Sequence, residues 1–196
     1  DINISRETAL SELLPLVQVA EALAQKYDAV VTNPPYMAVS NAGGKVNEYV
    51  KKTFPEAKAD LFAVFMEKGL SMLNKTGLQA MITQQAFLFT PSFAKFRDKV
   101  VTDRLVNLIH IGFNSFPELN SKVALGAAFV MCAIAYQDYE SRFLDLNSSY
   151  PPSSEKEEAF FTEKNEGYVA KSSMFVNIPN HAITYSFSNA ILSAFA

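Results

Sequence analysis

The chain has 196 residues, of which 49% are hydrophobic and 19% are charged, with a formal net charge of −3. This composition supplies a globular core, and no apolar run is long enough to span a membrane because charged and polar residues interrupt every candidate. Proteins that bind DNA by themselves usually present a basic surface, so the net negative charge counts against autonomous DNA binding.

Cysteine and histidine are scarce. Cys132 is the single cysteine and lies in an apolar run, so a disulfide within the chain is impossible. His110 and His181 are isolated, which argues against a structural zinc site. With no secretory signal in the first residues, this pattern is typical of a reducing, cytoplasmic setting, and we expect no metal and no membrane association.

The first predicted elements are a helix and a buried strand. Apolar residues recur at helical spacing over residues 7–26. Tyr27–Thr32 is a β-branched run that ends at Asn-Pro-Pro, which is typical of a strand leading into a loop. Residues 37–56 contain Gly43-Gly44 and several lysines, which predicts a mobile surface loop with one or two helical turns.

The middle of the chain alternates between helices and strands. Asp60 is placed to cap a helix that ends before Gly77. Its predicted inward residues are Leu61, Phe65, Met66, Leu70 and Leu73. Further predicted elements are a strand at 78–83, a helix at 91–101, and strands at 105–111 and 124–136. This alternation predicts an α/β sheet with helices on both faces.

The composition changes after residue 140. Residues 144–166 include the stretch NSSYPPSSEKEE, which is rich in serine, proline and charge. We therefore predict one unit over 1–140, a flexible linker over 141–167 and the start of a downstream region over 168–196. Because the chain opens on Asp1 directly in a helical pattern, we expect it to be a piece of a longer protein.

The most informative stretch is Asn33-Pro34-Pro35-Tyr36, at the predicted carboxyl end of a strand, where open α/β sheets bind ligands. Asn33 offers a side-chain carbonyl, and the fixed φ of Pro34 holds its own carbonyl in one direction. Tyr36 presents a flat aromatic face. Two acceptors beside an aromatic plate suit a planar ring that carries an amino group.

This stretch resembles the catalytic motif of S-adenosylmethionine-dependent amino-methyltransferases, above all the N6-adenine DNA methyltransferases. Two later blocks resemble the same family in order and spacing, namely ADLFAVFMEKGLSMLNKTGLQAMIT over 59–83 and FPELNSKVALGAAFVM over 116–131. IPNHAITYSFS, over 178–188, is similar to a segment of the large adenine methyltransferases of BREX phage defence, the PglX type. Type II restriction-modification methylases are the other branch that the motif suggests.

The resemblance implies a role for each matching residue. Asn33 and the Pro34 carbonyl would accept hydrogen bonds from the N6 amine, and Tyr36 would stack on the flipped adenine. Two further residues, Phe116 and Lys122, would lie near that base, although a solvated loop charge is the commoner explanation for the lysine. The residues that would pack on the adenine ring of the cofactor are Pro35 and Phe65. An ordinary core position explains Phe65 equally well.

The resemblance also implies what this chain lacks. The family's glycine-rich cofactor loop lies upstream of the motif, and no G-x-G pattern occurs in the chain. We therefore expect the C-terminal half of a Rossmann-like class I methyltransferase sheet, without the main cofactor-binding loop and without a target-recognition domain. Such a piece is expected neither to bind S-adenosylmethionine tightly nor to methylate DNA alone. The whole protein would act on double-stranded DNA, with restriction or defence subunits as further partners.

Other readings stay open. Protein-glutamine methyltransferases use the same Asn-Pro-Pro-Tyr cradle on a carboxamide, although the tail after Tyr136 favours DNA. A non-catalytic scaffold segment of a defence complex is a second alternative. Gln84 and Gln85 would line the site or simply end a strand, and the lysines near the motif would contact phosphate or only solvent.

Overall fold

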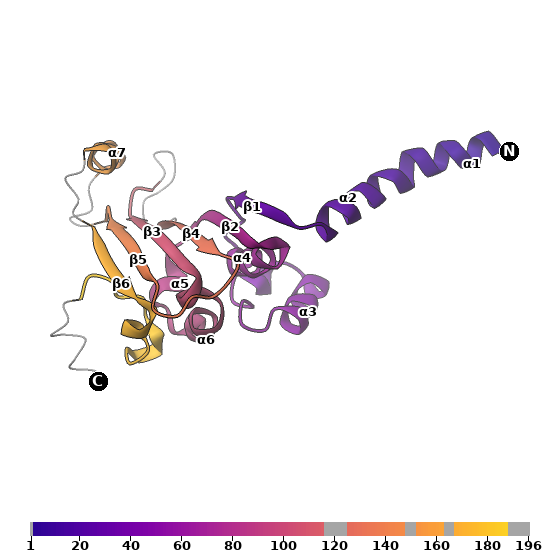
Figure 1. Ribbon diagram of the computed structural model, residues 1–196. Coiled ribbons are helices and arrows are strands. Elements are labelled where there is room, and N and C mark those ends of the chain that lie inside the picture. The colour runs from indigo at the N-terminus through magenta and orange to yellow at the C-terminus, as the bar shows by residue number, and fades with distance from the viewer. Residues whose placement is uncertain (1, 116–124, 148–151, 163–166, 188–196) are drawn as a thin grey trace.

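The computed structural model describes residues 2–115, 125–147, 152–162 and 167–187. Figure 1 shows one twisted sheet, helices α3 to α6 gathered on one side of it with α7 on the other, and a long N-terminal helix that extends away from the body. Within the described residues, no helix is long and apolar enough to cross a membrane. The same residues contain no group of three or more His, Cys, Asp or Glu side chains that could hold a metal ion.

The sheet has six strands in the order β1-β2-β4-β3-β5-β6. β1 pairs parallel with β2, and β3 pairs parallel with β5. β4 is antiparallel to both β2 and β3, so β2 and β3 run in the same direction. The carboxyl ends of β1, β2, β3 and β5 therefore lie at one edge of the sheet. The bounds are β1 Tyr27–Thr32, β2 Leu73–Gln84, β3 Leu105–Gly112, β4 Gly126–Cys132, β5 Glu140–Asp145 and β6 Tyr168–Lys171.

The predicted α/β sheet is confirmed, and the observed strands differ from the predicted ones mainly in where they begin and end. β2 begins at Leu73, directly after the preceding helix, so Gly77 lies inside the strand rather than beyond a helix end. A Cβ at Gly77 would lie 3.0 Å from the Tyr27 carbonyl oxygen, so β1 and β2 approach closely there. The hydrophobic cluster fills the space between the sheet and the helices on its covered face.

Helix α4 (Leu61–Met72) supplies much of that core. Phe62, Ala63 and Met66 are fully buried, and Phe62 packs against the ring of Phe93 at a centroid distance of 5.4 Å. Phe65 is 43% exposed, so the prediction that it points inward is wrong. Large apolar residues lie on both sides of this helix, and the position of the sheet decides which side is buried.

The remaining helices on this face are short. The predicted loop at 37–56 contains the ten-residue helix α3 (Gly44–Thr53), which is longer than expected. The predicted helix at 91–101 is present as a run of short helical segments with changing hydrogen-bond patterns. The bounds are η2 Val39–Asn41, α5 Ala86–Phe89, η3 Pro91–Phe93, α6 Ala94–Phe96, η4 Arg97–Val101 and η5 Thr102–Arg104.

The opposite face of the sheet is partly open. Val31 on β1 is 76% exposed, and a hollow of about 450 Å³ extends from it across apolar residues of β2, β3 and β4. Helix α7 (Ser153–Phe161) lies near the β3 end of the sheet, where the Lys156 ammonium donates to the carbonyls of Ile111 and Phe113. Helices therefore lie on both faces, but the described ones cover the second face only in part.

The N-terminal helical run, α1 (Ile2–Thr8), η1 (Ala9–Leu13) and α2 (Leu14–Ala24), is nearly detached from the body (Figure 1). No residue of η1 or α2 is buried. Its contact with the body includes the Tyr27 hydroxyl, which donates to the Ala22 carbonyl at 2.6 Å.

Deleting residues 1–20 is therefore expected to change the free energy of unfolding by less than about 0.5 kcal/mol, because the deletion exposes no core surface. Urea denaturation of the full and shortened chains measures this. A shortened chain that begins at Asn33, and so lacks β1, serves as the control that should lose the cooperative transition. A loss above about 2 kcal/mol on deletion of residues 1–20 alone would show that the helix packs on the body.

The C-terminal part continues the same sheet. β5 pairs with β3, and β6 pairs antiparallel with β5, while α7 lies within the segment predicted as a linker. η6 (Ser172–Phe175) and η7 (Pro179–His181) follow β6. The proposed division at residues 140 and 167 remains a prediction, and the described residues on either side of it share one sheet.

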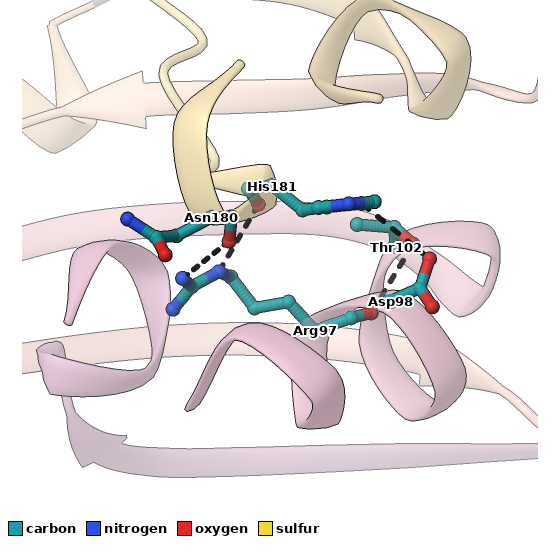
Figure 2. A network of polar contacts seen from close by, with 5 residues as sticks. All are labelled: Arg97, Asp98, Thr102, Asn180 and His181. Atoms are coloured by element: carbon teal, nitrogen blue, oxygen red, sulfur yellow. Dashed lines mark hydrogen bonds and ion pairs between the residues drawn. The ribbon is translucent and has the colours of Figure 1, made fainter. Parts of the chain in front are cut away.

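A buried arginine fastens the end of the described chain to the helices (Figure 2). Arg97 is fully buried, and its guanidinium donates to the carbonyls of Asn180 at 2.6 Å and His181 at 3.0 Å. It also donates to the carbonyls of Phe87 and Thr90, at 2.8 and 2.9 Å. Burial lowers the pKa of Arg97 to about 10, so the group stays charged at neutral pH.

Candidate active site

The Asn-Pro-Pro-Tyr stretch lies where the sequence placed it, directly after β1 at the carboxyl edge. The Asn33 and Pro35 side chains are exposed, Pro34 is buried and Tyr36 is half-buried. Pro34 therefore anchors the turn while Asn33 faces outward. Because a residue before proline is held in extended geometry, Asn33 and Pro34 have little freedom to rotate.

Tyr36 ties the motif to the neighbouring strand. Its hydroxyl lies 2.9 Å from the Asn33 Oδ1 and 3.2 Å from the Ile82 carbonyl oxygen on β2, and its one hydrogen can serve either acceptor. Burial raises the pKa of Tyr36, so the phenol stays protonated and can donate. An amide oxygen has two lone pairs, so Asn33 Oδ1 can accept from Tyr36 and from a bound amine together.

Asp60 holds the loop that follows the motif. Its Oδ1 accepts from the Phe62 N–H at 3.2 Å, as a helix cap does, and from the Met37 N–H at 3.0 Å. The Leu61 N–H donates back to the Met37 carbonyl at 2.9 Å. Partial burial raises the pKa of Asp60, while these backbone donors act in the opposite direction. The predicted cap is confirmed, and it also fixes the exit from the motif.

Other polar groups lie at the same edge. Gln85 follows β2, His110 is near the end of β3, and Asp145 ends β5. Phe116 and Lys122, the other predicted base contacts, lie outside the described residues, so their roles stay predictions. The described residues that flank them, Ser115 and Leu125, lie at this edge. The Leu125 carbonyl accepts from the Gln85 N–H at 2.7 Å. The Gly126 N–H donates to the Ser115 Oγ at 2.9 Å.

The predicted cofactor residues lie on the outside of the described chain. Pro35 is exposed and Phe65 is 43% exposed, so both present apolar surface that fits a flat ring. The hollow on the open face of the sheet includes Val31, Thr32 and Asn33 in its wall, but neither Pro35 nor Phe65. Pro35 and Phe65 supply apolar contact only, so they fit one part of S-adenosylmethionine and leave its ribose and amino-acid groups to other residues.

One group at this edge was missed by sequence reasoning. His110 is buried between Gln85 and Tyr185, with both of its ring nitrogens 2.6 Å from their side-chain oxygens. His110 was considered only as a metal ligand, and Tyr185 was not singled out. No local pattern connects residues 75 positions apart. In the sequence, only Gln84 and Gln85 at the end of β2 pointed to polar side chains at this edge.

Comparison with known proteins identifies relatives of this arrangement. The profile of the Eco57I restriction-modification methylase family matches residues 3–116, which include the motif and α4. The chain is 34% identical over 182 residues to the adenine-specific methyltransferase PglX of Lacticaseibacillus casei (strain Zhang), covering 89% of this chain and 15% of that protein. It is 36% identical over 130 residues to the adenine-specific methyltransferase BrxX of Escherichia coli O9:H4 (strain HS), covering 66% and 11%.

Solved structures share the fold. The methyltransferase subunit of a type I restriction-modification system from Streptococcus thermophilus matches with a TM-score of 0.57 at 15% identity, covering 83% of this chain and 38% of that one. The cryo-EM structure of a DrdV–DNA complex matches with a TM-score of 0.61 at 18% identity, covering 89% and 20%. The predicted methyltransferase-type sheet is thus confirmed, and the chain spans a small fraction of its relatives. With more than half of its length matched by one family profile, this chain belongs to the Eco57I restriction-modification methylases, a family of adenine-specific DNA methyltransferases.

Proposed function

We propose that this chain is the amine-binding part of an enzyme that methylates the N6 amino group of adenine in DNA, in restriction-modification or phage defence. The observation that carries this proposal is the rigid Asn-Pro-Pro-Tyr turn at the carboxyl edge, in a chain of this family. Its similarity to PglX and BrxX, both adenine-specific, favours adenine over other amines. The single half-buried cysteine is consistent with a reducing, cytoplasmic setting.

The residues of the turn act by hydrogen bonding and stacking. Asn33 Oδ1 and the Pro34 carbonyl accept the two amine hydrogens, which draws the nitrogen lone pair out of conjugation with the ring and makes it nucleophilic. Tyr36 stacks on the extruded base, since chemistry on a base requires that it leave the duplex. When bound, S-adenosylmethionine supplies the methyl group as a sulfonium electrophile.

The cofactor is held mainly by groups that this chain does not supply. We propose that Pro35 and Phe65 contact its adenine ring, and that the glycine-rich loop comes from another part of the full-length polypeptide. The chain alone is then expected to bind S-adenosylmethionine weakly and to leave DNA unmethylated. Methylation of duplex DNA by the purified chain would contradict this.

Transfer of isotope from labelled S-adenosylmethionine by the full-length protein tests the function. Label recovered as N6-methyladenine in DNA supports the proposal. Label found only in protein would instead favour methylation of a glutamine carboxamide, which the same acceptors suit. No label in either would favour a scaffold role.

A basic hollow next to the motif fits the DNA backbone. It measures about 690 Å³ and lies between the segments that follow β1 and β2, with Lys51, Lys58 and Lys95 in its wall. Lys99 forms an ion pair with Glu56, the acidic residue of this wall, so the lysines of the hollow keep a net positive charge. Ala59 of this wall is hydrogen-bonded to the loop after the motif, because its carbonyl accepts from the Val39 N–H.

We expect a Lys58→Ala/Lys95→Ala variant to bind duplex DNA with a weaker salt dependence. Each phosphate contact contributes about 0.9 to the slope of log K against log salt, so losing two lowers it by roughly 1.8. Fluorescence anisotropy of the full-length protein with a labelled duplex at several salt concentrations measures the slope. The matched control is Lys75→Ala/Lys171→Ala, which changes exposed lysines at the opposite edge of the sheet. Equal slopes for both variants would exclude the hollow as a phosphate site.

A further inference from the structure

A buried chain of polar side chains ends at the candidate active site. Tyr185 Oη lies 2.6 Å from His110 Nδ1, and His110 Nε2 lies 2.6 Å from Gln85 Oε1. His110 and Tyr185 are each 7% exposed, whereas Gln85 is half-buried. The chain of contacts therefore runs from the interior to the carboxyl end of β2.

The hydrogen-bond directions follow from the charge of His110. Burial lowers the pKa of His110, so the ring is neutral at physiological pH, with one nitrogen donating and one accepting. Because Gln85 Oε1 only accepts, His110 Nε2–H donates to it, and His110 Nδ1 accepts from the Tyr185 hydroxyl at 2.6 Å. The Asp145 carboxylate also faces Tyr185 and His110; burial, together with this carboxylate, raises the pKa of Tyr185 and so keeps the phenol protonated. This assignment rests on the network. It leaves the Gln85 NH₂ group without an acceptor in the described part of the chain.

The last described segment holds Tyr185 in place. Its ring stacks on Phe143 of β5, with centroids 4.9 Å apart and planes 9° from parallel. Two residues earlier, the Ile183 N–H donates to the Leu88 carbonyl at 2.9 Å. Before that, the carbonyls of residues 180 and 181 are bound by Arg97 (Figure 2). The position of Tyr185 is thus set by the body of the fold.

Gln85 is close to the motif in the sheet. β1 and β2 are neighbours with parallel carboxyl ends, and Tyr36 contacts the Ile82 carbonyl only three residues before Gln85. Asn33 presents an acceptor at this edge and Gln85 presents a donor. Adenine carries the matching pair on its Watson–Crick edge, an amine that donates and the ring nitrogen N1 that accepts.

We propose that the Gln85 NH₂ group donates to N1 of the extruded adenine, and that His110 and Tyr185 are positioning residues that orient this amide. The inference rests on the proposed function and names a base contact beyond the Asn-Pro-Pro-Tyr turn. It also assigns a role to the 178–185 segment, because Tyr185 at its end orients the Gln85 side chain through His110.

The test uses the full-length protein and duplexes that carry adenine or 1-deazaadenine at the target, since the analogue keeps the amine and lacks N1. Gln85→Leu is expected to lower kcat/KM on adenine by about 10- to 100-fold, because a base contact is lost, and to change it less than about threefold on 1-deazaadenine. An equal loss on both duplexes, or no loss on adenine, would overturn the proposal.

Tyr185→Phe separates positioning from a general structural role, because it keeps the stacked ring and removes only the hydroxyl. It should lower kcat/KM on adenine by about 3- to 10-fold with an unchanged melting temperature, and add nothing in the Gln85→Leu background. Tyr168→Phe, on a ring that also contacts Tyr185, is the matched control and should have no effect. Additive losses would show that Tyr185 does not act through Gln85, and a lowered melting temperature would assign it to stability; either result would overturn its positioning role. Wild-type protein that leaves adenine unmethylated would instead defeat the proposed function.

Discussion

Asn33→Ala in the full-length protein is expected to lower methyl transfer to DNA by at least about 100-fold. The substitution removes a carbonyl that accepts from the amine as it becomes nucleophilic, and one preorganised hydrogen-bonding group at such a site contributes about 100- to 1,000-fold to kcat. The loss should appear in kcat more than in KM, because Tyr36 and the remaining contacts still bind the base. Single-turnover transfer of labelled methyl groups measures it.

The structure supplies a matched control for this substitution. Asn41→Ala changes an exposed asparagine in the loop after the motif, whose Oδ1 accepts from the Ser40 hydroxyl at 3.5 Å rather than from Tyr36. It should leave the rate within a factor of two. Transfer by Asn33→Ala at the wild-type rate would refute the catalytic role of Asn33, whatever substrate the enzyme uses.

The sequence predicted the parts of the site that are local in the chain. The end of β1, the turn after it and the Asp60 cap all follow from short-range rules, in which Pro restricts its neighbours and Asp accepts from the first helical N–H groups. Each was found at the predicted residues. The helix at 44–53 was underestimated because its two leading glycines resemble a loop.

The features that depend on contacts between segments far apart in the sequence were not predictable. Phe65 was placed inward because it is large and apolar, yet Phe62 and Met66 are the buried residues of that helix. The strand at 73–77 was missed because Lys75 and Thr76 are polar and exposed there. The link between His110 and Tyr185 exists only once β5 and the final segment pack together.

Arg97→Met is expected to destabilise the chain by about 3–5 kcal/mol. The guanidinium is fully buried and donates to four carbonyls, and methionine fills a similar volume without a single donor. Each buried carbonyl left unpaired costs about 1–3 kcal/mol, reduced where the segment can move out to water. Urea denaturation measures the change. Arg142→Met, on an exposed arginine of β5, should stay within about 0.5 kcal/mol.

The same substitution distinguishes a fastening role of Arg97 from a general role in the core. Two of its four carbonyls belong to residues 180 and 181, where the backbone adopts positive φ values of 59° and 54°, a conformation that non-glycine residues adopt only when other contacts hold it. Without Arg97 these residues should relax first, so amide exchange should rise over 178–185 before the sheet opens. Since Tyr185 ends that segment, Arg97→Met should also reproduce the effect of Tyr185→Phe on adenine methylation. If exchange rises uniformly across the sheet instead, Arg97 stabilises the core and does not act through the segment that reaches His110.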